Sequence, residues 1–160
     1  MKKANIIDSE KIHKMQIAGF KDLLEKYTDY DTNPGAETLE RIKSRFAFDT
    51  IDHYFISLHG RNSFGVPERG EDIGCIRIQR LDENVHKLSQ MFILPEFQGK
   101  GYAQNAIYQA ELLYPKAKKW ILDIIKQEPK LRYLYEKMGY ILTGVEKNIK
   151  HGMDLVDYEK

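Results

Sequence analysis

The spacing of apolar residues in the first third of the chain predicts a short strand and two helices. Residues 3–7 suit a strand, and Asp8 or Ser9 can cap the helix that follows. That helix extends to Tyr27, because apolar residues recur in it at helical spacing: Ile12, Met15, Ile17, Phe20, Leu23 and Leu24. Pro34 prevents its continuation. A second helix is predicted at about 36–49, with four apolar side chains inward: Leu39, Ile42, Phe46 and Phe48.

The pattern then changes to the alternation that is typical of β-strands. Residues 52–60 and 73–80 alternate apolar and polar side chains, and a turn-rich loop, 61–72, separates them. Residues 85–95 suit a third strand, but their apolar side chains occupy both parities: Leu88, Phe92 and Leu94 are even, Met91 and Ile93 odd. Either a β-bulge or burial on both faces would explain this, and the sequence does not decide between them.

The second half of the chain predicts a strand–helix–strand unit, a further helix and two closing strands. A helix follows the loop 95–101, and residues 120–125 form an apolar strand. The next helix starts near Pro129 and stops at Gly139, before strands near 140–146 and 152–158. The stretch 88–125 requires a parallel crossover, whereas the other strands can pair as hairpins. We therefore expect an α/β fold with a mixed, mostly antiparallel sheet of about six to seven strands and helices on both faces.

Composition narrows the class of protein. The 160 residues contain no internal repeat or linker, which predicts a single domain over 1–160. With 25 basic and 24 acidic residues, the net charge of +1 lacks the positive excess of nucleic-acid or polybasic membrane binders. No apolar run approaches the ~20 residues of a membrane span. Cys75 is the single cysteine, so no intramolecular disulfide can form, and we expect a cytoplasmic protein.

One loop between a strand and a helix is the clearest candidate for a chemical role. It reads Gln98-Gly99-Lys100-Gly101-Tyr102-Ala103. Its glycines let the backbone turn sharply and approach a ligand closely. The amides and dipole at the start of the following helix favour an anion such as phosphate. The loop is neither a Walker A motif nor a Rossmann fingerprint, and taken alone it is equally consistent with a plain glycine-rich turn.

Two motifs in this order resemble those of one enzyme family. The loop at 98–103 resembles the Gln/Arg-x-x-Gly-x-Gly/Ala signature of GNAT-type N-acetyltransferases, and it follows an apolar strand and Pro95-Glu96 as in that family. The segment LYEKMGY at 134–140 resembles the family's LYEKxGF segment. The resemblance covers essentially the whole chain and implies a GNAT-like fold. It also implies transfer of the acetyl group of acetyl-CoA to a primary amine, by direct attack in a ternary complex.

The resemblance further implies roles for individual residues. The backbone amides of the glycine loop would bind the pyrophosphate of acetyl-CoA. These are the amides of Gln98, Gly99, Lys100, Gly101, Tyr102 and Ala103. The strand ending at Leu94 would splay from the strand at 120–125, so that Met91 and Ile93 offer backbone groups to the pantetheine and the acetyl carbonyl. Tyr135 would protonate the departing thiolate. Where many members carry Asn, this chain has Glu128, which when ionised accepts a hydrogen bond but cannot donate one.

Several of these residues also admit a purely structural role. Tyr135 lies on the apolar face of its helix, where a tyrosine is commonly a core residue. Lys87 stands at the position of the catalytic glutamate of some relatives, so the proton of the amine would have to go to Glu128, Asp123 or His86. The five histidines show no metal-ligand spacing, so no metal site is expected. Cys75 has no obvious partner and is expected to be structural.

The acceptor and the partners stay open at this level. Asp29, Asp31 and Glu37 make the 27–37 loop acidic, which would favour a cationic amine, although a solvated loop explains them equally well. Small amines, aminoglycosides, polyamines, peptide N-termini and lysines are all possible acceptors. No nucleic-acid or membrane partner is expected, and a homodimer is possible. Two competing functions are a non-catalytic acyl-CoA-binding sensor and an unrelated module that holds another phosphate, such as a nucleotide.

Overall fold

The computed structural model describes residues 1–58, 60–61, 67–68 and 70–160, with only the backbone described for the two short segments at 60–61 and 67–68. Part of the turn-rich loop predicted at 61–72 therefore lies outside the described residues. The helices are α1 (Ser9–Tyr27), α2 (Leu39–Arg45), α3 (Tyr102–Leu113) and α4 (Pro129–Lys137), with 3-10 turns η1 (Ile6–Asp8), η2 (Pro34–Ala36) and η3 (Pro95–Phe97). The strands are β1 (Lys2–Lys3), β2 (Ile51–Ser57), β3 (Gly60–Arg61), β4 (Pro67–Glu68), β5 (Asp72–Arg80), β6 (Val85–Ile93), β7 (Lys119–Ile125), β8 (Ile141–Lys150) and β9 (Met153–Glu159).

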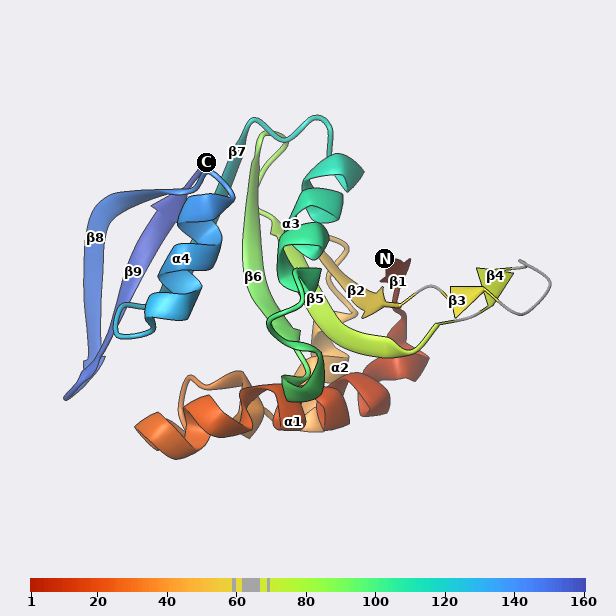
Figure 1. Cartoon of the computed structure of the whole chain (residues 1–160), viewed down its shortest axis with the longest axis horizontal. Coiled ribbons are helices and arrows are strands. Elements are labelled where there is room, and N and C mark those ends of the chain that lie inside the picture. Colours follow the sequence, from red (N-terminus) through yellow and green to blue (C-terminus); the bar gives the residue numbers. More distant parts are fainter. Residues whose placement is uncertain (59, 62–66, 69) are drawn as a thin grey trace.

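Seven of these strands form one mixed sheet in the order β1-β2-β5-β6-β7-β9-β8 (Figure 1). The pair β6/β7 is parallel, and the other pairs of this sheet are antiparallel. Helix α3 forms the crossover between the two parallel strands, as the strand–helix–strand pattern requires. The predicted α/β class and mixed sheet are confirmed.

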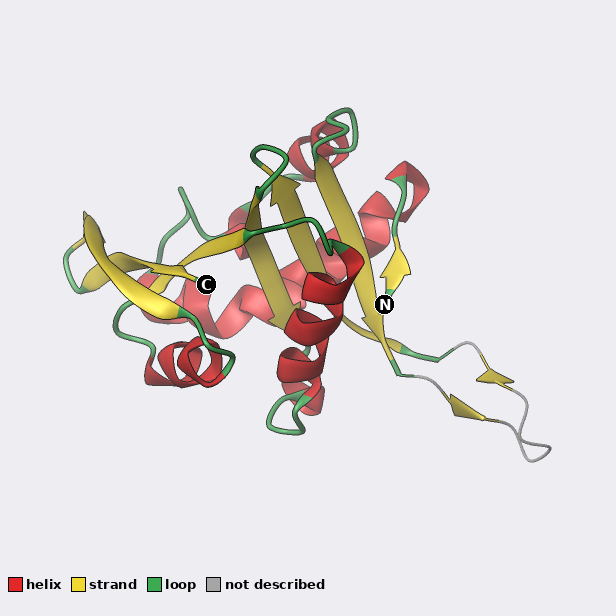
Figure 2. Ribbon diagram, turned by 90° about the horizontal axis from the view of Figure 1, so that it is seen from above, coloured by secondary structure: helices red, strands yellow, loops and turns green. Residues whose placement is uncertain are grey.

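Helices cover both faces of the sheet, and each face has its own core. Ile12 and Met15 of α1 and Ile42 of α2 pack with Phe55 and Phe92 of the sheet. On the other face, α3 and α4 pack on a larger cluster that includes Ala106, Ile107, Trp120, Tyr135 and Tyr158. Figure 2 shows α3 in front of the central strands and the long α1 behind them. Among the described residues, no helix is long and apolar enough to cross a membrane.

A β-bulge in β6 explains the mixed parity of its apolar residues. The register passes from Ile78↔Leu88 to Arg77↔Gln90, so Ser89 is an extra residue that has no partner on β5. An extra residue reverses the alternation of faces beyond it.

As a consequence, residues of both parities reach the same core. Leu88 lies before the bulge and Met91 and Ile93 lie beyond it, yet all three belong to the core beneath α3 and α4. Phe92 packs instead in the core beneath α1. Of the two possibilities open at the sequence level, the structure shows the bulge.

The N-terminal boundaries differ from those predicted. The first strand spans only Lys2–Lys3, and Ile6–Asp8 form a 3-10 turn before α1. The cap is not Asp8 or Ser9 acting on α1. Instead, the side chain of Asn5 accepts from the amide of Ile7 at 2.9 Å, and Asp8 accepts from the amide of Asn5 at 2.9 Å. This capping box satisfies the amides ahead of the long helix.

Two further predictions are wrong in detail. The second helix is shorter than 36–49, because Thr38 caps it and accepts from the amide of Arg41 at 3.3 Å, and Phe48 is 57% exposed rather than inward. The predicted alternation of exposed and buried residues also fails in β2, where residues 52–56 are all buried. Helices lie on both faces of this strand, so polar side chains such as Asp52 and His53 are buried as well.

Candidate active site

The sheet opens between its two parallel strands. Pairing of β6 with β7 extends only from Val85↔Lys119 to Lys87↔Ile121. Beyond that point β6 continues to pair with β5, whereas β7 continues to pair with β9. A gap therefore lies between the second halves of β6 and β7, as the divergence of the two halves of the sheet in Figure 1 shows.

The backbone of Met91 and Ile93 faces this gap. The amide of Leu94 donates to the carbonyl of Ile73 in β5, at 2.8 Å. Because backbone groups alternate in direction along a strand, Phe92 also points toward β5, and Met91 and Ile93 point away from it. In agreement, the carbonyl of Ile93 accepts a 2.8 Å hydrogen bond from the side-chain amide of Gln98.

The glycine loop lies at the end of β6, where it leads into α3. Gly99 and Gly101 have φ of +75° and +81°, in the left-handed region, and a Cβ built on either would have no atom within 4 Å. These glycines are therefore required by the backbone conformation, and the space above them is open. The Lys100 ammonium donates to the carbonyl of Glu96 at 3.0 Å, within the loop itself.

A row of backbone amides at this loop has no acceptor. From Gly99 to Gln104, six successive amides donate to no acceptor among the described residues, and the amide of Asn105 is the first that does, to the carbonyl of Gly101 at 3.1 Å. Gly101, the N-cap residue of α3, provides no side-chain cap. Converging amides at the start of a twelve-residue helix fit an anionic group such as a phosphate.

Tyr135 of α4 is a buried residue whose hydroxyl has no partner among the described residues. Tyr135 is 7% exposed, and its ring packs edge-on against Tyr140 with centroids 5.8 Å apart. Its hydroxyl makes no hydrogen bond with any residue that the structure describes. Burial raises the pKa of this phenol, and the charge of Asp123 raises it further, so it stays protonated at neutral pH. A core tyrosine with a satisfied hydroxyl would have shown a partner, and none is present in the described part of the chain.

Glu128 lies at the start of α4 and joins two helices. Its Oε1 accepts hydrogen bonds of 2.6 Å from Lys26 and 2.6 Å from Tyr27, both at the end of α1. Burial raises the pKa of Glu128, but these two hydrogen bonds outweigh burial and lower it overall. A carboxylate that is paired in this way is a poor proton acceptor. Its geometry favours a structural role at the open end of the gap.

The two other candidate bases lie on opposite faces of the sheet. His86 is buried beneath α3 against Tyr114 and Trp120, with ring centroids 4.9 and 5.3 Å away, where β6 and β7 are still paired. Asp123 lies on the face away from α3 and α4 and forms an ion pair with Lys87, the last residue of β6 that pairs with β7. Asp123 is thus the candidate that lies beside the opening, and its ion pair with Lys87 is a partly exposed one, with side chains 34% and 32% exposed, whereas Glu128 is held by two hydrogen bonds.

A hollow of about 250 Å³ adjoins Asp123, and sequence reasoning missed it. Its lining residues come from four strands: Lys87, Ile121, Leu122, Asp123, Thr143, Val145, Asp157, Tyr158 and Glu159. Asp157 is the direct cross-strand neighbour of Asp123, and Glu159 that of Ile121. Asp123 is paired with Lys87 and Glu159 with Lys119, so Asp157 is the carboxylate of this surface that has no ion pair among the described residues and can attract a cation. The alternation in 153–159 could have placed Asp157 and Glu159 on one face, but only the register of β7 with β9 brings them to Asp123.

The acids of the 27–37 loop do not form the cation-attracting lip that the sequence suggested. Asp29 is buried and accepts from the amides of Asp31 and Thr32, at 3.2 and 3.1 Å, which fixes a turn. Glu37 forms ion pairs with three arginines (Arg41, Arg45 and Arg77). The negative charges of Asp29 and Glu37 are therefore engaged inside the fold, and Asp31 alone of the three is exposed.

Cys75 and the possible metal ligands can be placed as well. Cys75 is buried in the core beneath α1, and burial raises the pKa of its thiol, so it is not a nucleophile. Within the described ranges, no three His, Cys, Asp or Glu side chains gather closely enough to hold a metal ion.

Two features characterise acetyltransferases that use a coenzyme A thioester. The sheet opens between two parallel strands, and a glycine turn with free backbone amides lies beside the gap. The chain belongs to the GNAT acetyltransferase family, since the model of the acetyltransferase (GNAT) domain matches residues 59–142. A search among curated proteins gives no significant match.

Solved structures share the fold over nearly the whole chain. A spermidine N-acetyltransferase from Vibrio cholerae, described in complex with CoA and spermine, has a TM-score of 0.72 at 18% identity and covers 99% of this chain and 92% of its own. An acetyltransferase from Thermus thermophilus has a TM-score of 0.71 at 13% identity, covering 99% and 94%. A dodecameric form of the Vibrio cholerae enzyme has a TM-score of 0.65 at 18% identity, covering 99% and 91%.

Proposed function

We propose that this chain transfers the acetyl group of acetyl-CoA to a primary amine by direct attack in a ternary complex. The observation that carries the proposal is the row of six amides without acceptors, from Gly99 to Gln104, beside the gap between β6 and β7. Bound acetyl-CoA would supply the activated acyl group as a thioester. The fold neighbour described with CoA and spermine supports an amine as the acceptor.

The donor would be held by the loop and by the free edge of β6. Backbone amides from Gly99 to Ala103 would bind the pyrophosphate, since they lie at the positive end of the α3 dipole. The amide of Gln98, expected in this set from the sequence, donates instead to the carbonyl of Pro95 at 3.2 Å. The backbone groups of Met91 and Ile93 face the gap and would hydrogen-bond the pantetheine and polarise the acetyl carbonyl. The hydrogen bond from Gln98 to Ile93 fixes the loop relative to this strand.

The amine would enter through the acidic hollow. An alkylammonium with a pKa of ~10.4 is almost entirely charged at pH 7, so the site must remove a proton before attack. Asp123 lies where the strands part and would accept that proton, directly or through a water. Asp157, its cross-strand neighbour, adds the negative charge that draws an ammonium group into the hollow. In this proposal Asp123 is the base, and Glu128 has the structural role of joining α1 to the start of α4.

Tyr135 would complete the reaction as the acid. Its hydroxyl is protonated at neutral pH and makes no hydrogen bond to the described residues, so it is available to the departing thiolate. Donation of its proton would prevent the thiolate from attacking the new amide.

Thiol release from acetyl-CoA across a panel of amines tests the proposal. We expect coenzyme A to raise the melting temperature, and thiol release to depend on the amine. Asp123→Asn should lower kcat by about 100-fold, within the usual range for loss of a general base. Asp154→Asn, a matched change on the same strand as Asp157 but outside the hollow, should leave kcat unchanged.

The competing functions give different results in this assay. A sensor would bind acetyl-CoA and release no thiol with any amine. A module for another phosphate would be stabilised by a nucleotide and not by coenzyme A.

A further inference from the structure

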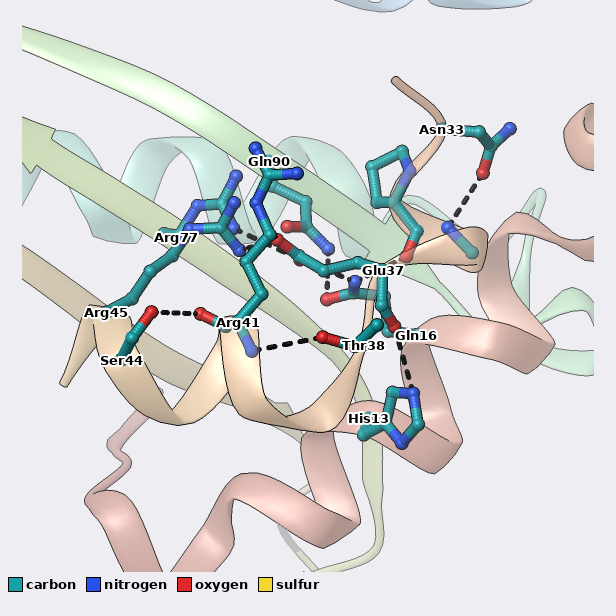
Figure 3. A network of polar contacts seen from close by, with 12 residues as sticks. His13, Gln16, Asn33, Glu37, Thr38, Arg41, Ser44, Arg45, Arg77 and Gln90 are labelled. Atoms are coloured by element: carbon teal, nitrogen blue, oxygen red, sulfur yellow. Dashed lines mark hydrogen bonds and ion pairs between the residues drawn. The ribbon is translucent and has the colours of Figure 1, made fainter. Parts of the chain in front are cut away.

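A cluster of arginines lies beneath the sheet, on the same side as α1 and α2 (Figure 3). Arg45 of α2 and Arg77 of β5 have side chains only 18% and 14% exposed, and both contact the buried carboxylate of Glu37. Arg41 reaches the same carboxylate from solvent, at 3.4 Å. One carboxylate therefore faces three guanidinium groups, which leaves the cluster positively charged.

Nη1 of Arg45 is buried and makes no hydrogen bond with any described residue, although it contacts Glu37. The guanidinium of Arg77 is paired more loosely. Its nearest acidic oxygen is Oε2 of Glu37, 3.8 Å from Nη1, and that oxygen accepts instead from the side-chain amide of Gln16 at 3.0 Å. Arg77 makes no hydrogen bond with any residue in the described part of the chain. A guanidinium carries five N–H donors, and buried donors normally have acceptors. Burial and the nearby Arg45 lower the pKa of Arg77 to about 10, so it is charged at neutral pH.

A small cavity adjoins Arg77 and has a polar wall. It measures about 10 Å³ and is lined by Ile12, Gln16, His53, Cys75, Ile76, Arg77 and Gln90. Burial and the charges of Arg77 and Arg45 together lower the pKa of His53 to about 4, so His53 is neutral at pH 7. A space of this size corresponds to one water molecule, so it can take a single carboxylate oxygen and no larger group.

The cluster lies on the face from which the amine would approach. On strand β5 the side chains of Arg77 and Cys75 point to the same face, and Cys75 packs beneath α1. Ile76 and Ile78 belong to the core on the other face. Asp123 also points away from that core, between Leu122 and Ile124. Strand β6 alone separates β5 from β7, and at ~4.8 Å per strand the two Cα atoms are roughly 10 Å apart before the gap widens the distance.

We propose that the acceptor amine carries a carboxylate, which Arg77 and Arg45 bind while the amine lies beside Asp123. This inference rests on the proposed acetyltransferase function and names the substrate class of the same site. A guanidinium fork binds a carboxylate with two parallel hydrogen bonds, which the side chains around Arg77 do not provide. A polyamine would instead bring further positive charge to this cluster.

Matched acceptors test the proposal on the unmodified protein. Thiol release is measured with ω-amino acids of graded length, with alkylamines of the same chain lengths, and with spermidine. We expect kcat/KM to be about 10- to 100-fold higher for the best amino acid than for its matched alkylamine, because hydrogen bonds to a charged group are the stronger kind. Equal kcat/KM for the matched pair, or a preference for spermidine, would overturn the proposal.

Variants then assign the preference to Arg77. Arg77→Met should abolish the preference for the amino acid, so that the ratio of kcat/KM between the amino acid and its matched alkylamine falls to about one; this ratio cancels any general effect of the lost contact with Glu37. Arg77→Lys should restore part of the preference. Arg41→Met removes a charge from the same Glu37 but on the solvent side, and should keep the preference intact. A preference that persists in folded Arg77→Met would also overturn the assignment.

The same experiment distinguishes failure of the carboxylate subsite from failure of the proposed acetyltransferase function. If no amine of any kind releases thiol, the proposed acetyltransferase function fails. If alkylamines and amino acids are acetylated equally well, the function holds and the carboxylate subsite is wrong. Should Arg77→Met fail to fold in thermal melts, the comparison of acceptors on the unmodified chain still decides.

Discussion

The side-chain amide of Gln98 donates a 2.8 Å hydrogen bond to the backbone carbonyl of Ile93. This contact joins the first residue of the glycine loop to the strand edge that faces the gap. The two parts that would hold the donor, amides in the loop and backbone groups on β6, are therefore fixed relative to each other. Preorganisation of this kind lowers the entropic cost of binding.

Replacement of Gln98 should weaken donor binding without unfolding the protein. Gln98→Glu keeps the size of the side chain but replaces the donor by a carboxylate that repels the carbonyl of Ile93. We expect the Kd for acetyl-CoA, measured by calorimetry, to rise about 10-fold or more, since one lost hydrogen bond is worth ~1 kcal/mol and repulsion adds to it. Gln109→Glu, the same change in the later part of α3, should leave Kd unaltered. Equal affinity of both variants would show that the contact does not organise the site.

Gly101 gives a second prediction about the same loop. Its φ of +81° is strained for any other residue, and the space above it is open. Gly101→Glu adds both backbone strain and a negative charge among the amides, so binding of acetyl-CoA in a thermal-shift assay should be lost. Gly152 has a φ of +77° and equally open space, but lies in the turn between β8 and β9. Gly152→Glu should therefore carry the strain while retaining acetyl-CoA binding; if it too abolishes binding, the loss is not specific to the loop.

The features that local pattern encodes were predictable. The glycine turn depends on neighbours within a few residues, and the parallel crossover on the order of strand, helix and strand along 88–125; both are present in the structure. In the sequence, the bulge at Ser89 was visible only as an irregular alternation of the apolar residues in 85–95. Its position could not be predicted, because it depends on the register of β6 against β5.

Contacts between distant residues were not predictable. Glu128 was interpreted from its position before Tyr135, yet its partners are Lys26 and Tyr27, about a hundred residues earlier. The acidic surface at Asp123 and Asp157 depends on the pairing of β7 with β9, and parity within one strand says nothing about that register. The charge of Glu37 was read as solvent-facing because the arginine that faces it across the fold, Arg77, lies on another element.

The Glu128 contact predicts a pH dependence of stability. Hydrogen bonds from Lys26 and Tyr27 outweigh burial and lower the pKa of Glu128 from its ordinary value of 4.5. Ionised Glu128 therefore stabilises the fold above that ordinary value, and this stabilisation disappears as the pH falls through the lower pKa of the folded state. Glu128→Gln should melt below the parent at pH 7, and the difference should shrink progressively below about pH 4.5.

Thermal melts from pH 7 to pH 3 measure this effect. Glu25→Gln removes a carboxylate from an exposed pair with Lys21, 3.8 Å apart, and should change the melting temperature little at any pH. A difference between Glu128→Gln and the parent that stays constant across this range would exclude the linkage.

Tyr135 gives the most direct test of the chemistry. Burial raises the pKa of Tyr135 and Asp123 raises it further, so the phenol is a proton donor at every pH near neutrality. Tyr135→Phe keeps the ring that packs against Tyr140 and removes only this proton, so kcat should fall by about 10- to 1000-fold. The melting temperature and the Kd for acetyl-CoA should change little, because the hydroxyl bonds to no described residue. Tyr140→Phe is the matched control: its hydroxyl donates to Glu111 at 3.1 Å, so its loss should cost ~1 kcal/mol of stability while kcat per folded molecule holds. If steady-state kinetics and melts gave the reverse, with Tyr135→Phe less stable and fully active, the hydroxyl would be structural and the acid of the reaction would have to be another group.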